Sequence, residues 1–388
     1  MKLAIIRQKY SAFGGAERFI ERLLPGLRAN HVDVTLIARQ WAGEADSPMQ
    51  WLRCDPFYLG SAWRDRSFAK AACATVAQND FDLVQSHERL SCCDIFRAGD
   101  GVHAAWLEAR QKYLGESLAW LKRNPFNRLH ANSLAAERRM FGSPRLKKII
   151  CISDMVRQDI RRFYRVPDDK LVTIYNGIDL DAFCLQSDEK RREIREKLHI
   201  PQDALVYVFV GSGFKRKGLE TAIRALPDDA YLIVVGKDKE TARFQKIAAQ
   251  KGVNDDQCQR VLFVGPQKDV RPYYAAADAF VFPTIYEPFG SVVLEALACG
   301  LPVITTDRCG AGELITQGVE GFVLPAGDTA AFAACMRQNT ALDWANRRAA
   351  ARASAERYPI SRTVDAMLAL YQELGRKHHP VRDTADDQ

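Results

Sequence analysis

The chain has 388 residues, of which 47% are hydrophobic and 27% charged, and its formal net charge is +7. This length exceeds one ordinary compact domain and predicts two domains of similar size. No apolar run is long enough to span a membrane, and the N-terminal run "LAII" is too short for a signal peptide.

Short apolar runs alternate with helical patterns in the first half. "LAII" precedes a stretch in which Phe19, Ile20, Leu23, Leu24 and Leu27 repeat at helical spacing, and "VDVTLIAR" follows it. "FDLVQSH", "DIFRAGDG", "KKIICIS" and "KLVTIYNGIDLDAF" are further strand candidates. Strands that are continuous apolar runs between helices indicate parallel sheets covered on both faces.

The second half repeats this rhythm. "ALVYVFVGSG", "AYLIVVGKD", "RVLFVGP", "AFVFPT", "LPVITTD" and "GFVLPAG" are predicted strands, and "SVVLEALACG" is a predicted helix that a glycine ends. Two such halves predict an α/β protein with two Rossmann-like domains, 1–177 and 178–355, and a hinge near 176–179. The polar residues 377–388 are predicted to be a disordered tail.

The ten cysteines include no C-x-x-C pair, and only Cys92 and Cys93 are close in the sequence. Most lie in apolar surroundings, which predicts small buried free thiols in a reducing cytoplasm. No zinc site is expected.

A basic loop follows one strand of the second half. "VGSGFKRKG" begins like a dinucleotide-binding fingerprint, but Arg216 stands where the third glycine would be. This disfavours a nicotinamide oxidoreductase. Lys215, Arg216 and Lys217 at the carboxyl end of a strand favour a phosphate ligand, with a solvated basic turn as the alternative.

Two glutamates, Glu287 and Glu295, frame the stretch "EPFGSVVLE". Gly290 or Ser291 is expected to open a helix there, whose N-terminus attracts phosphate. Carboxylates accept hydrogen bonds from hydroxyl groups and repel phosphates. The arrangement predicts a ligand with phosphates in the middle and hydroxyls at both ends, as in a nucleoside diphosphate sugar. The alternatives are ordinary stabilisation of a helix N-terminus for Glu295 and a solvated loop for Glu287.

The E-x7-E spacing of Glu287 and Glu295 resembles that of the family 4 retaining glycosyltransferases, which have the GT-B fold. "FGGAER", "IYNGID", "GSGFKRKG" and "EALACGLPVITTD" resemble further segments of that family, in the same order. "QKYSAFGGAERF" and "GSGFKRKGLE" are most similar to lipopolysaccharide core glucosyltransferases. The resemblance implies that the two domains face each other across a cleft. It also implies that a C-terminal helix, about 356–376, packs back on the N-terminal domain.

The resemblance also implies roles for single residues. Arg216 and Lys217 would stabilise the departing diphosphate, Glu287 would hold hydroxyls of the donor sugar, and Glu295 would hold the ribose diol. Backbone groups would contact the donor at the positions Gly14, Gly15, Phe289, Gly290, Ser291 and Val292.

Asp100 lies in "RAGDGVH", and the lipopolysaccharide-core branch of the family resembles this chain in having an aspartate there, near the reacting carbon. A plain Asp-Gly turn is the alternative. His103 is a rival for this role. His87 and Glu88 follow another predicted strand and are candidates to contact the acceptor, with a structural role as the alternative.

The resemblance implies a hexose donor, glucose on UDP, and a heptose of the lipopolysaccharide inner core as acceptor. It implies retention of anomeric configuration and no cofactor. The D-x-D pattern at 179–181 is interpreted as chance, and no metal requirement is predicted. Alternatives are another UDP-sugar, N-acetylglucosamine or galactose, used for capsule or another glycolipid. A non-catalytic sugar-nucleotide-binding protein and an epimerase also stay open, although no acid/base pair for an epimerase can be identified.

Residues 104–148 contain ten Lys and Arg against three Asp and Glu. Trp106, Tyr113 and Trp120 recur every seven residues, each followed by a leucine, which on a helix makes an apolar stripe flanked by cations. This predicts contact with an anionic membrane surface, at the inner face of the cytoplasmic membrane. The alternatives are a helix docked on its own domain and an acceptor that carries phosphates. Nucleic acid is not expected, because no recognised binding module accompanies the charge.

Overall fold

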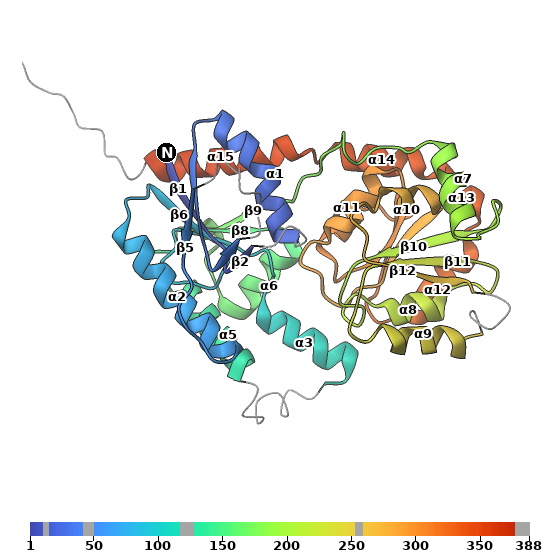
Figure 1. The fold of residues 1–388 in the computed structure, drawn as a ribbon, viewed down its shortest axis with the longest axis horizontal. Helices are drawn as coiled ribbons and strands as arrows, with labels where there is room; N and C mark the ends of the chain where they lie inside the picture. The colour runs from blue at the N-terminus through green and yellow to red at the C-terminus, as the bar shows by residue number, and fades with distance from the viewer. Residues whose placement is uncertain (11–14, 42–49, 117–127, 253–258, 377–388) are drawn as a thin grey trace, which may run out of the picture. The chain divides into compact units, whose positions relative to one another are not determined.

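The computed structural model describes residues 1–10, 15–41, 50–116, 128–252 and 259–376 (Figure 1). The chain forms two compact units. The N-terminal unit comprises Met1–Gln111, Glu116–Gly177 and the chain from Ile360; the C-terminal unit comprises Lys112–Gly115 and Ile178–Pro359. The predicted tail, 377–388, lies outside the described residues.

The N-terminal unit is built on a parallel sheet. Among the described residues its strands lie in the order β5 (Gln50–Arg53), β3 (Asp33–Ala38), β1 (Lys2–Ile6), β6 (Leu83–Ser86), β7 (Ile95–Arg97), β8 (Lys148–Cys151) and β9 (Leu171–Thr173). A two-stranded sheet pairs β2 (Lys9–Tyr10) with β4 (Gln40–Trp41). The helices are α1 (Gly15–Ala29), α2 (Ser61–Gln78), α3 (His103–Leu114), α5 (Arg128–Phe141), α6 (Asp154–Tyr164) and α15 (Ile360–Arg376).

The C-terminal unit has a second parallel sheet. Its described strands lie in the order β12 (Val261–Gly265), β11 (Tyr231–Val235), β10 (Val206–Val210), β13 (Ala279–Phe282), β14 (Val303–Thr306) and β15 (Gly321–Leu324). The helices are α7 (Asp188–Lys197), α8 (Leu219–Ala225), α9 (Thr241–Gln250), α10 (Arg271–Ala276), α11 (Ser291–Ala298), α12 (Thr329–Gln338), α13 (Ala341–Asn346) and α14 (Arg348–Glu356). The prediction of two Rossmann-like α/β halves is therefore confirmed.

Both sheets reverse their strand order at one point. In the N-terminal sheet the reversal lies between β1 and β6, and in the C-terminal sheet it lies between β10 and β13. Loops at the carboxyl ends of these strands diverge to opposite faces, which leaves a crevice where ligands bind in open α/β sheets. The two reversals are therefore the places at which functional side chains are sought.

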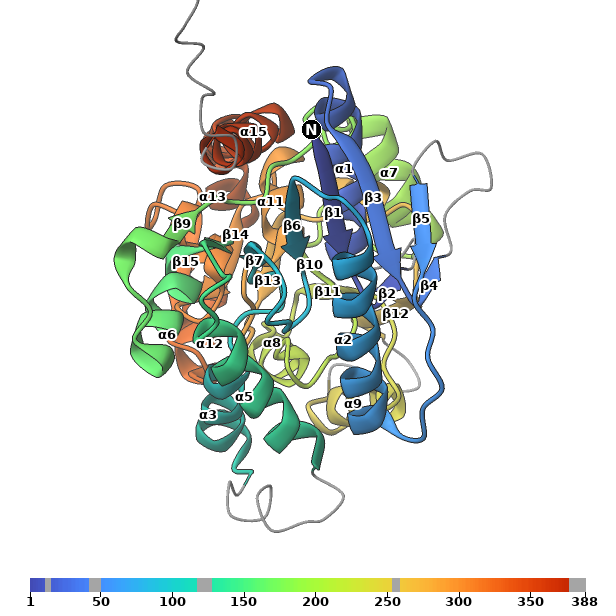
Figure 2. The same cartoon turned by 90° about the vertical axis from the view of Figure 1, so that its left-hand side faces the viewer.

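The last helix, α15, packs on the first part of the chain (Figure 2). Its buried Val364, Met367 and Tyr371 join the same apolar cluster as Ile20 and Leu23 of α1. The helical spacing that predicted α1 is thus confirmed, since its apolar face is the one that is buried. The burial of both faces at this contact explains why the chain returns to the N-terminal unit at its end.

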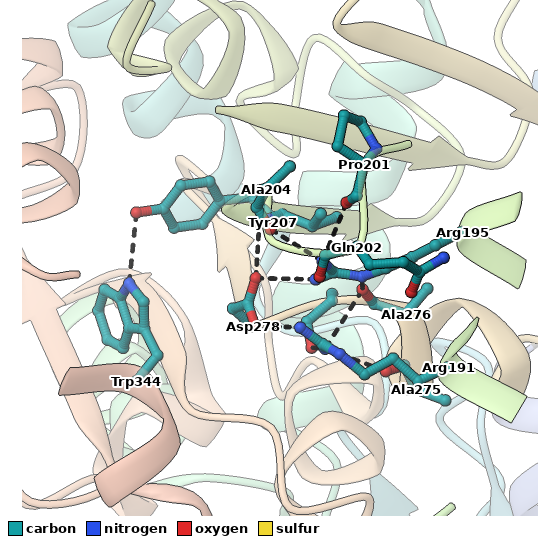
Figure 3. A network of polar contacts seen from close by, with 12 residues as sticks. Arg191, Arg195, Pro201, Gln202, Ala204, Tyr207, Ala275, Ala276, Asp278 and Trp344 are labelled. Atoms are coloured by element: carbon teal, nitrogen blue, oxygen red, sulfur yellow. Dashed lines mark hydrogen bonds and ion pairs between the residues drawn. The ribbon is translucent and has the colours of Figure 1, made fainter. Parts of the chain in front are cut away.

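A closed polar network lies at the amino end of the C-terminal sheet (Figure 3). Asp278 accepts hydrogen bonds from Arg191 at 2.6 Å, from Arg195 at 3.0 Å and from the backbone N–H of Val206 at 2.8 Å. Arg195, whose side chain is fully buried, also donates to the carbonyl oxygens of Ala276, Gln202 and Ala204. Buried charges need such complete pairing to be tolerated.

The cysteine prediction is wrong for one pair. Cys73 of α2 and Cys92, in the loop between β6 and β7, form a disulfide with a Cα–Cα distance of 5.7 Å. No pattern in the sequence indicates this bond, because the pairing depends on α2 lying against that loop. The other cysteines that the structure describes are free thiols, and burial raises the pKa of Cys93, Cys151 and Cys299 to about 12.

None of the described helices combines the length and the apolar character needed to cross a lipid bilayer.

Candidate active site

The basic loop follows β10 at the reversal point of the C-terminal sheet. Glycines at both ends allow the chain to turn tightly, since Gly213 has a φ of +78° and Gly218 a φ of +76°. A Cβ atom on Gly218 would lie 1.9 Å from the carbonyl oxygen of Pro283, so only glycine fits there. The carbonyl of Arg216 accepts hydrogen bonds from the Ile285 N–H and the Thr284 hydroxyl, at 3.0 and 3.2 Å. The loop is thereby fixed to the end of β13.

The segment that carries Glu287 follows β13 and is held by a neighbouring loop. The N–H of Glu287 donates to the Arg308 carbonyl at 2.9 Å, and the Gly310 N–H donates to the Glu287 carbonyl at 2.9 Å. Helix α11 then begins at Ser291, with Gly290 as its N-cap at a φ of +88°. The positive end of the helix dipole therefore lies directly after Glu287, as expected from the sequence.

The predicted residues Phe289, Gly290, Ser291 and Val292 make up this turn. Phe289 is buried, and its carbonyl accepts hydrogen bonds from the Ala311 N–H at 2.6 Å and the Cys309 thiol at 3.3 Å. A Cβ atom on Gly290 would lie 2.9 Å from the Cys309 sulfur and 3.2 Å from Cγ of Glu287. Glycine at this position lets the Glu287 side chain reach its place beside the helix N-terminus.

Arg216, Lys217 and Glu287 meet at this point. Glu287 Oε2 accepts a hydrogen bond from Arg216 Nη1 at 2.7 Å and lies 4.0 Å from Lys217 Nζ. Arg216 also donates to the Tyr286 carbonyl at 3.0 Å. Two cations thus share one carboxylate, and an anion such as a phosphate would complete the charge balance.

The surroundings of Lys217 leave its ammonium group available to bind such an anion. Only 13% of its side chain is exposed, and Nζ lies 5.2 Å from the centre of the Phe282 ring. Burial lowers the pKa of Lys217, with Glu287 opposing this effect and Arg216 adding to it. Among the described residues no acceptor lies within hydrogen-bonding distance of Nζ, so its donors are available to a ligand.

Glu295 lies one turn into α11 and is 4% exposed, deeper than a solvated carboxylate at a helix start would be. Its Oε2 lies 3.5 Å from the Tyr274 hydroxyl. The structure therefore separates the two glutamates, with Glu287 beside the basic loop and Glu295 at the wall formed by α10.

Sequence reasoning missed two residues that shape the basic loop. Asp238, just after β11, accepts a hydrogen bond from the Phe214 N–H at 2.8 Å, and Thr284 anchors Arg216 as described above. Asp238 is the last residue of the predicted strand run "AYLIVVGKD" and Thr284 the last of "AFVFPT", and both strands pair with β10. Their position at the carboxyl ends of strands is the signal that could have found them.

The N-terminal unit gathers different groups at its own reversal point. Arg7, which follows β1, donates from Nη1 to Asp100 Oδ2 at 3.1 Å and to Glu88 Oε1 at 3.4 Å. Glu88 Oε1 also accepts from the Gln8 N–H at 2.9 Å. The structure thus brings the predicted Asp100 and Glu88 together through Arg7, which sequence reasoning did not single out.

The pKa values of these two carboxyls move in opposite directions. Burial raises the pKa of Glu88, and the nearby Arg7 only partly offsets it. Burial would also raise the pKa of Asp100, but Arg7, Arg89 and Arg97 outweigh it and the pKa is lowered. Asp100, with half of its side chain exposed, is the more accessible of the two carboxyls, and its lowered pKa favours the charged form.

The predicted His87 has a buried side chain that contacts Gln85. Its Nε2 lies 3.1 Å from the amide nitrogen of Gln85, whose oxygen accepts a hydrogen bond from the Tyr371 hydroxyl at 2.8 Å. Since that amide donates, Nε2 accepts and the imidazole carries its proton on Nδ1. Burial, with Arg97 and Arg7, keeps the pKa of His87 well below its ordinary value, so the ring is neutral.

His103, the predicted rival of Asp100, makes its contacts elsewhere. Its backbone N–H donates to Glu137 at 2.7 Å, and its Nε2 lies 3.0 Å from Nδ1 of His130, which in turn lies close to Arg110. Burial is the main cause that lowers the pKa of His103 to about 3. Within the described residues no hydrogen bond or ion pair joins His103 to Asp100.

The remaining predicted positions are Gly14, Gly15 and the D-x-D pattern at 179–181. Gly15 is the first residue of α1, and Gly14 lies outside the described residues. Asp179, in the D-x-D pattern, accepts hydrogen bonds from the N–H groups of Asp181 and Ala182, so it is engaged in a local turn. Over the residues that the structure describes, no group of three or more His, Cys, Asp or Glu side chains is placed to hold a metal ion.

The apolar stripe that Trp106, Tyr113 and Trp120 would make on one helix is interrupted in the structure. Helix α3 ends at Leu114 because Gly115 adopts a φ of +64°, and Leu107 is buried. The chain resumes helical structure at Arg128, in α5. Trp120, Leu121, Lys122 and Arg123 lie outside the described residues.

Comparison with known proteins identifies both halves of the chain. Residues 13–182 match the family model described as Glycosyltransferase Family 4, and residues 190–357 match that of Glycosyl transferases group 1. The lipopolysaccharide glucosyltransferase WaaG of Escherichia coli is 25% identical over 332 residues, 84% of this chain and 85% of that protein.

Solved structures agree on the architecture. A crystal structure of WaaG, a glycosyltransferase involved in lipopolysaccharide biosynthesis, superposes with a TM-score of 0.77 at 23% identity, over 97% of this chain and 99% of that one. The Anabaena protein HepE in complex with UDP-glucose superposes with a TM-score of 0.70 at 18% identity, over 96% and 100%. The chain belongs to the glycosyltransferases of the GT-B fold, with a family 4 N-terminal half and a group 1 C-terminal half, and is related to lipopolysaccharide core glucosyltransferases.

Proposed function

We propose that this glycosyltransferase moves glucose from UDP-glucose to a heptose of the lipopolysaccharide inner core, with retention of configuration. The observation that carries the proposal is the meeting of Arg216, Lys217 and Glu287 at the N-terminus of α11. This arrangement joins a cationic site for a diphosphate to a carboxylate that accepts sugar hydroxyls. The relatives support the finer choices, since WaaG is named a lipopolysaccharide glucosyltransferase and HepE binds UDP-glucose.

The donor would lie along the loops after β10 and β13. Arg216 and Lys217 would contact the diphosphate and stabilise the charge that develops as it departs. Glu287, freed in part from Arg216 by the incoming phosphate, would accept hydrogen bonds from the transferring sugar. The turn Phe289 to Val292 would bring backbone N–H groups to sugar and phosphate, and Glu295 would hold the ribose diol.

The acceptor would use the groups at the reversal point of the N-terminal sheet. Asp100 is accessible and charged, and Arg7 fixes its position. Asp100 would orient the attacking hydroxyl, with Glu88 holding Arg7 from the other side. Gly14 and Gly15 would let the backbone approach the transferring sugar. His87 and His103 would support this region through their contacts with Gln85 and Glu137.

In the proposed reaction, the acceptor oxygen forms a bond to the anomeric carbon on the face from which the diphosphate departs. The bond from that carbon to the diphosphate oxygen breaks, and the acceptor proton passes to this leaving oxygen. A protein base is then not needed, so rate enhancement comes from positioning and charge stabilisation. Because Arg216 and Lys217 supply the positive charge, we propose that no metal ion or other cofactor is required.

We further propose that the protein acts at the inner face of the cytoplasmic membrane, where a lipid-linked acceptor would be found. The cationic surplus of residues 104–148 supports contact with an anionic lipid surface.

The test incubates purified protein with UDP-glucose, UDP-galactose and UDP-N-acetylglucosamine, each with and without truncated lipopolysaccharide that ends in heptose. Released UDP is the readout. The proposal expects acceptor-dependent release from UDP-glucose, an unchanged anomeric configuration of the product by NMR, and full activity in the presence of EDTA. Release from another donor would assign capsule or other glycolipid synthesis instead. Tight UDP binding without release from any donor would favour a sugar-nucleotide-binding protein.

A further inference from the structure

A group of large apolar side chains lies exposed on the N-terminal unit, just before and within the first turn of α2. Phe57 is 74% exposed, Leu59 68% and Trp63 49%. Of the eight exposed large hydrophobic side chains in the described residues, five fall between Trp51 and Trp63. The other three are isolated in the C-terminal unit. Clustering of this kind marks an interaction surface, whereas scattered exposed apolar residues need no explanation.

The surface is held rigidly by a buried arginine. Arg39, which is 4% exposed, donates hydrogen bonds to Asp55 at 2.8 Å, to the Pro56 carbonyl at 2.7 Å and to the Arg64 carbonyl at 3.0 Å. Its guanidinium also lies over the Tyr58 ring at 4.6 Å. These contacts fix the segment before α2 to the first turns of the helix, so the exposed side chains belong to an ordered surface.

Leu59 and Trp63 border a groove between α2 and α5, two helices that lie side by side (Figure 2), and the Phe57 ring lies 5.9 Å from that of Trp63. The groove has a volume of about 1130 Å³, and its lining includes Leu59, Trp63 and Leu129 together with Arg66 and Lys70. Leu129 belongs to the cationic range 104–148, so the groove is continuous with the segment whose sequence predicts contact with anionic lipid.

The charge around the groove is positive. Among the described residues, Arg66 and Lys70 have no carboxylate partner; Arg66 donates to the side-chain oxygen of Asn132. The nearby carboxylates are already paired, Asp55 with Arg39 and Arg53, and Asp65 with Arg64. Cations beside the groove are therefore left to complement a negative partner.

Tryptophan, phenylalanine and leucine beside lysine and arginine suit the boundary between lipid headgroups and acyl chains. An interface with another protein would instead be depleted of lysine. We propose that Phe57, Leu59 and Trp63 insert into the surface of a membrane that contains anionic phospholipid, with Arg66 and Lys70 contacting lipid phosphate groups. This extends the membrane-bound acceptor of the proposed function, and it assigns the docking surface to α2 and α5 as well as to the cationic segment.

The test measures flotation of the purified protein with phosphatidylcholine vesicles that contain or lack phosphatidylglycerol. Replacing Phe57, Leu59 and Trp63 together with serine should lower binding to the anionic vesicles roughly tenfold or more. The matched control is Leu342→Ser, since Leu342 is 69% exposed but isolated in the C-terminal unit, and binding should not change. Arg66→Glu with Lys70→Glu should weaken binding by roughly fivefold per cation, and only to vesicles that contain phosphatidylglycerol.

UDP release with a water-soluble heptose acceptor separates this proposal from the proposed function. The serine variant should keep wild-type turnover and a wild-type thermal melt while losing vesicle binding. If turnover is absent from every variant and from the wild type, the vesicle result still decides the docking surface. Wild-type binding by the serine variant would overturn the proposal, as would a change in its oligomeric mass with unchanged vesicle binding. Loss of binding only on Lys122→Glu with Arg123→Glu would also overturn it.

Discussion

Each end of the C-terminal sheet carries two cations beside one carboxylate, but the two groups differ in exposure and in how fully they are hydrogen-bonded. At the amino end Arg191 and Arg195 surround Asp278, and at the carboxyl end Arg216 and Lys217 surround Glu287. Backbone carbonyls complete the hydrogen bonds of Arg195, whose side chain is fully buried. The side chain of Arg216 is 33% exposed, and its guanidinium group donates two hydrogen bonds within the described residues. The first set is closed and stabilises the fold, whereas the second is open to a ligand.

The difference follows from where the chain supplies acceptors. The loops at the amino end bring several carbonyl oxygens to Arg195, so each nitrogen of its guanidinium group has an acceptor. At the carboxyl end the guanidinium group of Arg216 has one carbonyl partner among the described residues, that of Tyr286, and α11 begins shortly after Glu287, so its N-terminus adds positive potential there. The ion pairs at the amino end are thus fully hydrogen-bonded within the fold, whereas those at the carboxyl end keep N–H donors for the donor substrate that we propose.

The largest expected effect is on the stability of the fold, through the group of Arg191, Arg195 and Asp278. Asp278→Asn would leave Arg195 buried without its counter-ion and should lower the free energy of unfolding by about 3–5 kcal/mol. Urea denaturation followed by circular dichroism measures this. The control is Asp228→Asn, which breaks an exposed pair with Lys251 and should cost about 0–1 kcal/mol. Equal losses for the two variants would contradict the distinction between closed and open sets.

Substitution in the group of Arg216, Lys217 and Glu287 should instead lower the reaction rate and leave the stability nearly unchanged. Lys217→Ala should lower the rate of UDP release on the order of 10²–10³-fold, since it removes a charge that stabilises the leaving diphosphate. Its free energy of unfolding should stay close to wild type, because burial already lowers the pKa of Lys217 and disfavours its charge. The matched control is Lys246→Ala, on the exposed face of α9, with unchanged kinetics. A Lys217 variant with normal turnover would remove the basic loop from the site.

The loop that carries Arg216 and Lys217 also depends on the close approach of Gly218 to the backbone of Pro283. Gly218→Ala combines a positive φ with a Cβ atom 1.9 Å from the Pro283 carbonyl oxygen and should cost about 2–3 kcal/mol of unfolding free energy. Gly252→Ala has a similar φ of +77° and open space, so it should cost only about 1 kcal/mol. Thermal melts of both variants isolate the steric part. Identical melting temperatures would show that the loop does not need to touch β13.

The smallest effect concerns the histidines of the N-terminal unit. The pKa of His103 is about 3 in the folded protein, below its ordinary 6.5, so the unfolded chain takes up a proton first as the pH falls. The stabilisation is therefore complete above pH 6.5 and is lost progressively toward pH 3. This predicts a loss of about 1.4 kcal/mol in unfolding free energy between pH values of about 7.5 and about 5.5.

His103→Phe should remove that part of the pH dependence, measured by denaturation at several pH values. His31→Asn is the control, since His31 is exposed and asparagine tolerates its φ of +57°. An unchanged slope in the His103 variant would mean that this histidine takes up its proton as readily when folded as when unfolded.

Much of the C-terminal site could be predicted from short segments. The apolar run before Gly211 and the basic residues after it predicted a loop at a strand end, and the structure places that loop at the reversal point. Gly290 predicted the start of α11 because helix starts depend on local backbone chemistry. Such features involve residues only a few positions apart, so the sequence contains all the partners.

The N-terminal site could be predicted only in part. Asp100 and Glu88 were candidates, but Arg7, which joins them, lies more than eighty residues before Glu88 in the chain. His87 was a candidate to contact the acceptor or to have a structural role, and its contact with Gln85, which Tyr371 of α15 holds, could not be predicted. Contacts between residues so far apart in the sequence depend on the order of the strands in the sheet and on where α15 packs. Hydrophobic periodicity does not encode either of these.

The sequence by itself determined the two α/β halves, the basic loop and the E-x7-E segment, because strand and helix periodicity and turn chemistry are local properties. Only the tertiary structure decided that Cys73 bonds to Cys92, that Glu295 is buried, and that Arg216 is left open where Arg195 is closed. Burial and the supply of hydrogen-bond acceptors are set by neighbours distant in the chain. They determine whether a charged residue stabilises the fold or meets a ligand.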